Sequence, residues 1–163
     1  DTLNHILAAL MPANRLVLIV SKRTGLRIGD VLSIKTEQVR KGRWTLKEQK
    51  TGKTRRITIG KQLQADLLAQ AGRVWVFEHR TDWRKHRTRQ AVYKDIKRAS
   101  KLFRCRGQIS PHSVRKAWAV AEFGRSGYNL KRLQNLLNHS NEGVTLIYAM
   151  ADEVTQRILG TID

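Results

Sequence analysis

The sequence has little of three things, namely cysteine, long apolar runs and acidic residues. Its single cysteine, Cys105, excludes a disulfide bond within the chain. Apolar runs are short, as in the five residues from Leu16 to Val20, whereas a membrane-spanning helix needs roughly 18. The chain does not open on a signal-peptide pattern. We therefore expect a cytoplasmic protein that does not enter a membrane.

The acidic residues are both few and scattered. The chain has 13 Asp and Glu against 32 Lys and Arg, which gives a net charge of +19 and a pI of about 11.1. This charge predicts a polyanionic partner, first of all nucleic acid, although charge alone fits a structural RNA-binding protein equally well. The only adjacent acids are Asp152 and Glu153, so the clustered carboxylates of a metal-dependent nuclease are missing. We expect no metal requirement and no cofactor.

Apolar periodicity predicts a mainly helical protein with one core. With 40% apolar residues among 163, the chain is long enough to bury that core. Helical spacing predicts helices at about 2–10, 14–23, 30–32, 63–68, 92–103, 111–123 and from 129, with two short helical stretches at the end of the chain. Gly25 stands where the second of these helices should stop.

A change of period between residues 43 and 60 predicts a β-hairpin. Apolar and polar residues alternate on both sides of a basic turn: Trp44 and Leu46 before it, Lys50-Thr51-Gly52-Lys53 in it, and Ile57 and Ile59 after it. Val74 to Phe77 is predicted as a short third strand. Glu78 to Arg89 is charged and aperiodic, which predicts a loop whose basic residues face nucleic acid. The expected fold class is mainly α with a small antiparallel β-sheet, in a single domain over residues 1–163.

Two short segments place an arginine on the same helical face as another polar residue. Asp30 follows Arg27 by three positions, and Arg115 follows His112 by three positions just after Pro111. The start of a helix also carries partial positive charge and free N–H groups, which favour a nearby phosphate. Taken alone, each segment is better explained by an ordinary surface pair, so a functional interpretation needs further residues.

The segment from Leu136 to Tyr148 supplies those residues. It contains His139 and, nine residues later, Tyr148, whose hydroxyl is a candidate nucleophile. The arginine at 27, the hairpin lysine at 50, the His-x-x-Arg pair at 112 and 115, and this histidine and tyrosine follow one another along the chain. In this order and spacing they resemble the catalytic domain of the tyrosine recombinase (phage integrase) family. The resemblance covers essentially the whole chain.

The resemblance implies a covalent reaction that uses neither metal nor ATP. Tyr148 would attack a DNA phosphodiester, form a 3′-phosphotyrosyl bond and release a 5′-hydroxyl. Arg27 and Arg115 would hold the two non-bridging oxygens of the phosphate. Asp30 would orient Arg27.

Three further residues take proton-transfer or hydrogen-bonding roles by the same resemblance. Lys50 would protonate the leaving 5′-oxygen, with Lys53 as the alternative donor. His112 resembles the general acid/base that exchanges the tyrosine proton, and His139 resembles a donor to the scissile phosphate.

The resemblance also implies partners and a location. We expect double-stranded DNA as the partner and four protomers on DNA, with a monomer for the chain alone. The chain begins directly at the catalytic portion, so we expect a C-terminal fragment that lacks the family's N-terminal core-binding domain. Four apolar residues near the end would dock on a neighbouring protomer or on their own domain: Val154, Ile158, Leu159 and Ile162. The cell would be bacterial, or a host infected by a phage.

Two alternatives share part of this pattern. A type IB-like topoisomerase cuts and reseals one strand through the same covalent intermediate, and these residues do not reveal strand exchange between duplexes. A non-catalytic DNA-binding module could be built on the same helices, but it has no need of a tyrosine placed after the last histidine. The complete set of six residues therefore argues against a binding module, and the length of the chain favours a recombinase over a topoisomerase.

Overall fold

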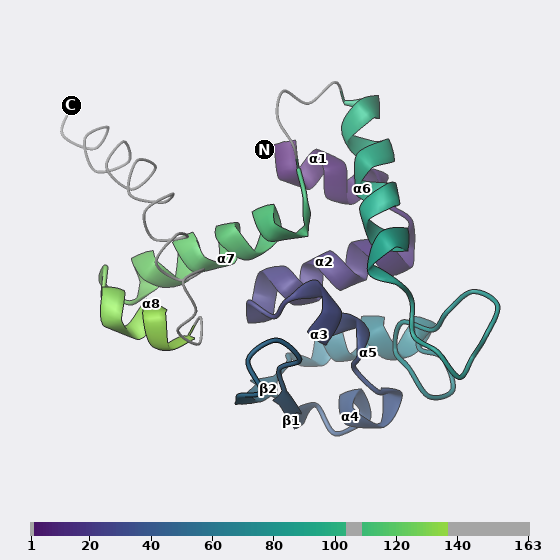
Figure 1. The fold of residues 1–163 in the computed structure, drawn as a ribbon, viewed down its shortest axis with the longest axis horizontal. Coiled ribbons are helices and arrows are strands. Elements are labelled where there is room, and N and C mark those ends of the chain that lie inside the picture. Colours follow the sequence, from purple (N-terminus) through teal and green to yellow (C-terminus); the bar gives the residue numbers. More distant parts are fainter. Residues whose placement is uncertain (1, 104–108, 137–163) are drawn as a thin grey trace. The chain divides into compact units, whose positions relative to one another are not determined.

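The structure is a computed structural model that describes residues 2–103 and 109–136, and the chain divides into two compact units, residues 1–115 and 116–163. Within the described residues the helices and strands follow in the order α1 Thr2–Ala9, α2 Pro12–Thr24, α3 Ile28–Leu32, α4 Thr36–Arg40, β1 Arg43–Lys47, β2 Thr54–Thr58, α5 Lys61–Gln70, α6 Arg89–Leu102, α7 Pro111–Arg125 and α8 Leu130–Leu136 (Figure 1). The predicted fold class, mainly α with a small antiparallel sheet, is confirmed. The single domain stays a prediction. None of the described helices is long and apolar enough to cross a membrane.

The first unit is built around α2. Its side chains Val17, Leu18 and Val20 are fully buried, and α2 packs against α1 and α3, while α6 packs against the same two helices (Figure 1). Pro12 is the first residue of α2, a position where the missing N–H of proline costs nothing. The apolar stripes of the helices in the first unit therefore form one shared core.

The hairpin forms as predicted. β1 and β2 pair antiparallel with Trp44 opposite Ile57, and both of these side chains are buried together with Leu46. Alternate residues of β1 are exposed, which is the pattern of a strand with one face on the core. The turn between the strands carries Lys50.

The predicted third strand at Val74 to Phe77 is wrong. This segment forms one isolated bridge, between Trp75 and Lys35, and then turns. Val76 and Phe77 are fully buried in the core. A short apolar run of this kind shows no periodicity, so its sequence does not distinguish a strand from a buried loop. The predicted loop from Glu78 is confirmed, and α6 begins where that loop ends, at Arg89.

The second unit contains the later part of α7 and α8. Trp118, Ala119 and Leu133 form its described core. Between the two helices, Tyr128 has a positive φ of 63° and its ring meets the edge of Phe123 at a centroid distance of 5.3 Å. The last two predicted helical stretches and the apolar residues near the end lie outside the described residues.

A buried carboxylate joins three helices of the first unit. Asp95 of α6 is only 7% exposed. It accepts hydrogen bonds from the backbone N–H of Met11 and the amide of Asn14, both at 2.8 Å. It also pairs with Arg98, which in turn donates to the carbonyl of Ala9. The end of α1 and the start of α2 are thereby tied to α6.

Asp95→Asn should lower the free energy of unfolding by about 3 kcal/mol, because an amide would place a donor against donors in a buried site. Burial raises the pKa of Asp95, but the hydrogen bonds from Asn14, Arg98 and Met11 outweigh it and the pKa lies below its ordinary value. The contribution is therefore present above the ordinary carboxyl pKa of 3.8 and is lost as the pH falls through the lowered one. Urea unfolding at several pH values measures both effects. Asp82→Asn is the control and should lose far less, because Asp82 is 19% exposed and pairs with the largely exposed Arg84. An equal loss in both variants would contradict the assignment.

Candidate active site

Arg27 is positioned by the way α2 ends. Gly25 adopts the left-handed conformation, with φ 70°, and its N–H donates to the carbonyl of Ser21. The hydroxyl of Ser21 donates in turn to the carbonyl of Leu26 at 2.8 Å. A left-handed glycine after the last helical residue turns the chain sharply at little steric cost. Arg27 consequently stands as the N-terminal capping residue of α3, as the sequence predicts.

Glu48, which sequence reasoning missed, is the direct partner of Arg27. Its carboxylate is 2% exposed and accepts from the Nη1 of Arg27 at 2.8 Å. The same carboxylate accepts from the hydroxyl of Thr51 at 3.0 Å and from the Nη1 of Arg55 at 3.3 Å. A buried carboxylate is stable only with such partners. The guanidinium of Arg27, itself 13% exposed, is thus held from the hairpin.

Two other arginines hold the chain just before Arg27. The Nη2 of Arg55 donates to the carbonyl of Thr24 at 2.8 Å. The Nε of Arg115, on the first turns of α7, donates to the carbonyl of Gly25 at 3.0 Å. Arg115 is only 5% exposed. The two arginines predicted to bind one phosphate therefore meet at the same turn of the chain.

Asp30 lies within the electrostatic reach of both predicted arginines. It is 1% exposed, its Oδ1 accepts the backbone N–H of Gln49 at 2.9 Å, and its Oδ2 has no hydrogen-bond partner within the described part of the chain. Burial raises the pKa of Asp30 above its ordinary value; nearby Glu48 adds to the rise, while the bond from Gln49 and the charges of Arg27 and Arg115 oppose it. That Asp30 itself orients Arg27 stays a prediction.

Asp30→Asn should become more stable relative to the wild type as the pH rises. Below the ordinary carboxyl pKa of 3.8, Asp30 is protonated in both the folded and the unfolded chain. Between that value and its raised pKa in the folded protein, ionisation favours the unfolded chain, so the wild type loses stability that the amide keeps. Melting temperatures of the two proteins across this range measure the difference. A difference that falls with rising pH, as expected for Asp95→Asn with its opposite pKa shift, would contradict this account.

The basic turn of the hairpin presents Lys50 on its surface. Lys50 and Lys53 are both exposed. The backbone of the turn is closed by two bonds, from the N–H of Glu48 to the carbonyl of Lys53 and from the N–H of Gly52 to the carbonyl of Glu48. Lys50 follows Glu48 by two residues, so the lysine is on the segment that holds Arg27. The choice between Lys50 and Lys53 as proton donor stays open.

His112 lies on the first turn of α7, as predicted, and is exposed. It precedes Arg115 by three positions on that helix. His139 and Tyr148, the two remaining residues of the predicted set, lie outside the described residues. The structure therefore brings Arg27, Arg115 and Asp30 together and places the Lys50 turn beside them through Glu48.

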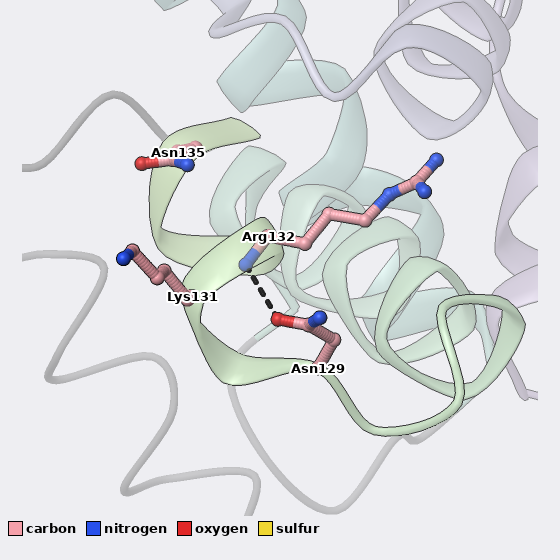
Figure 2. Close-up of a pocket in the computed structure, with 4 residues that line it drawn as sticks. All are labelled: Asn129, Lys131, Arg132 and Asn135. Carbon is pink, nitrogen blue, oxygen red and sulfur yellow. Dashed lines mark hydrogen bonds between the residues drawn. The ribbon is translucent and has the colours of Figure 1, made fainter.

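The second unit contains a hollow of its own. It has a volume of about 400 Å³ and is lined by Asn129, Lys131, Arg132 and Asn135 (Figure 2). The side chain of Asn129 accepts the backbone N–H of Arg132 at 2.9 Å (Figure 2), which caps the start of α8. Of the predicted active-site residues that the structure describes, none lines this hollow.

The sequence as a whole matches a known family. The model of the Phage integrase family matches residues 1–154. The chain therefore belongs to the phage integrase family, which confirms the family that the order of the motifs indicates.

Individual relatives agree with this assignment. The chain is 29% identical over 144 residues to the integrase of Escherichia phage P2, covering 88% of this chain and 40% of that protein. It is 32% identical over 126 residues to an integrase/recombinase of Escherichia coli, covering 69% of this chain and 36% of that protein. The chain thus spans about two-fifths of the length of these relatives.

Solved structures share the fold. A λ integrase dimer bound to a COC′ core site superposes with a TM-score of 0.68 at 19% identity, over 90% of this chain and 56% of that one. XerH recombinase bound to difH substrate superposes with a TM-score of 0.67 at 18% identity, over 94% of this chain and 49% of that one. At this level of identity the likeness establishes the fold.

Proposed function

We propose that this chain is the part of a site-specific integrase/recombinase that breaks and rejoins DNA strands through Tyr148. The observation that carries the proposal is the meeting of Arg27 and Arg115 at the Gly25 turn, beside the hairpin that bears Lys50. Two guanidinium groups and an ammonium group suit a phosphodiester whose negative charge grows during reaction. Membership of the phage integrase family supports this assignment.

In the cleavage step, the phenolic oxygen of Tyr148 bonds to phosphorus as the bond from phosphorus to the 5′-oxygen breaks. His112 takes the tyrosine proton, and its exposure at the start of α7 suits contact with another segment. Lys50 gives a proton to the leaving 5′-oxygen. Arg27 and Arg115 neutralise the charge on the non-bridging oxygens, and His139 donates a further hydrogen bond.

The rejoining step is the reverse reaction with a new 5′-hydroxyl. That hydroxyl attacks the 3′-phosphotyrosyl bond, Lys50 takes its proton, and Tyr148 leaves with a proton returned by His112. The bond energy is kept in the phosphotyrosine, so the cycle consumes no ATP and, in this proposal, no metal ion. Because the cycle is reversible, the same groups serve both directions.

Double-stranded DNA is the proposed partner. The net charge of +19 favours it, and the λ integrase and XerH structures of the same fold are bound to a core site and to difH substrate. Affinity should fall steeply with salt, because phosphate contacts release counterions. An assembly of four protomers on DNA, with a monomer in its absence, completes the proposal.

The test is a search for a covalent protein–DNA adduct. The protein is incubated with EDTA and a pool of nicked duplexes of varied sequence, from which the cleaved 5′ end diffuses away, and the products are separated in SDS. An adduct whose DNA-bearing peptide contains Tyr148 supports the proposal. An adduct on another residue, or cleavage that requires a divalent metal and leaves no adduct, would overturn it.

A further inference from the structure

The carboxylate of Glu48 contacts more than Arg27. It is almost completely buried and, among the described residues, accepts hydrogen bonds from the side chains of Arg27, Thr51 and Arg55. Two of these belong to different functional segments, because Arg27 opens α3 and Thr51 lies in the turn next to Lys50. Glu48 is therefore a direct link between the two.

The residues on both sides of Lys50 are fixed by buried carboxylates. Before it, the backbone N–H of Gln49 donates to the Oδ1 of Asp30 at 2.9 Å. After it, the hydroxyl of Thr51 donates to the Oε2 of Glu48 at 3.0 Å. The backbone of Lys50 is consequently anchored at both neighbours, while its side chain is exposed. A turn held in this way fixes the position from which the side chain of Lys50 extends.

We propose that Glu48 is a positioning residue that sets the Lys50 turn against Arg27, so that the proton donor and the phosphate-binding arginine act on the same phosphodiester. The assignment rests on the proposed function and adds to it a residue that acts through Arg27 and the Lys50 turn. One carboxylate oxygen, Oε2, accepts from both Arg27 and Thr51. A shift of either partner therefore moves the other.

The cost of losing this link should appear in the chemical step. Small misplacements of reacting groups lower rates by up to about 100-fold. A lysine that is displaced from the 5′-oxygen no longer protonates it as the bond to phosphorus breaks. DNA affinity should not fall, because removing a negative charge makes the protein more basic. The two effects can be measured separately.

Glu48→Gln keeps the shape of the side chain and removes its charge. We expect single-turnover cleavage of the nicked duplex at saturating protein to slow by about 10- to 100-fold, with DNA affinity unchanged or higher. On a duplex whose scissile 5′-oxygen is replaced by sulfur, the loss should shrink to a few-fold, because a thiolate leaves without a proton. Thr51→Val removes the bond from the turn to Glu48 and the 3.3 Å bond that the same hydroxyl accepts from the N–H of Lys53. If Glu48→Gln is unstable, this variant should show the same pattern in a folded protein.

Two further variants calibrate this experiment. Glu37→Gln removes the same charge from an exposed pair with Lys41 on α4 and should leave both substrates unaffected. Lys50→Ala removes the proposed proton donor itself, so the extent to which the sulfur substrate restores its cleavage rate sets the upper limit for the rescue of Glu48→Gln.

Three outcomes would overturn the proposal. Wild-type rates in both Glu48→Gln and Thr51→Val would show that the link does not serve the reaction. An equal loss on the oxygen and sulfur substrates would mean that Glu48 does not act through Lys50. A Lys50→Ala protein that sulfur does not rescue would remove the role on which the proposal rests. Failure of the proposed function is a different result, because the wild-type protein itself would then form no adduct at Tyr148.

Discussion

Arg115→Lys should slow cleavage by about 10²- to 10³-fold, which corresponds to about 2.7–4 kcal/mol of lost transition-state stabilisation. Lysine keeps the positive charge, but it lacks the planar guanidinium, which can donate to the carbonyl of Gly25 and to a phosphate at the same time. In the folded protein the Nε of Arg115 is bonded to the carbonyl of Gly25, which aims the rest of the guanidinium. Single-turnover cleavage at saturating protein measures the loss.

Arg55→Lys is the matched comparison for this prediction. Arg55 donates to the carbonyl of Thr24, one residue before the acceptor of Arg115, and it is similarly shielded. Both substitutions remove an anchor from the same turn, and Arg55→Lys also disturbs the pair with Glu48, so its melting temperature should fall at least as far as that of Arg115→Lys. The rate of Arg55→Lys should fall far less. Equal rate losses would mean that Arg115 only holds the turn and does not meet the phosphate.

Tyr148→Phe should abolish the covalent adduct altogether while leaving DNA affinity nearly unchanged. The substitution removes one oxygen, which is the atom proposed to attack phosphorus, and keeps the aromatic ring. SDS-resistant adduct formation and a binding titration at low salt measure the two quantities on the same preparation.

Tyr93→Phe is the control for the loss of a tyrosine hydroxyl. Tyr93 lies on the outer side of α6 and is about half exposed, and it has no place in the proposed reaction. Its variant should form the adduct at the wild-type rate. An adduct that persists in Tyr148→Phe would assign the nucleophile to another side chain and remove the central step of the proposed function.

Local sequence signals were sufficient for most of the described helices, for the hairpin and for the turn that precedes Arg27. Gly25 at a helix end and the alternation around Trp44 and Leu46 each reflect a backbone preference within a few residues, and the structure contains both. The short helix α4 was missed because its five residues include only one buried apolar side chain, Val39. One buried apolar residue cannot show the repeating spacing that identifies a helix in a sequence.

Glu48 could have been found from the same alternation. Trp44, Leu46 and Glu48 follow one another at a spacing of two, so all three point to the buried face of β1. An acid on a buried face requires a partner, and a basic chain offers many. Which arginines it pairs with could not be predicted, because Arg27 and Arg55 reach it through the folded arrangement of α3 and the hairpin.

The hydrogen bond from Arg115 to Gly25 joins residues that are 90 positions apart. This separation affects the stage of folding at which the protein becomes able to bind a phosphodiester. During synthesis from the N-terminus, Arg27, Glu48 and Arg55 are all available to one another long before α7 emerges. The loop closed by Arg115 is much longer than the one closed by Arg55, which spans 31 positions, and closing it costs more chain entropy. The arginine pair should therefore be completed late, so that a half-made chain can carry a folded hairpin and still be unable to engage a phosphodiester.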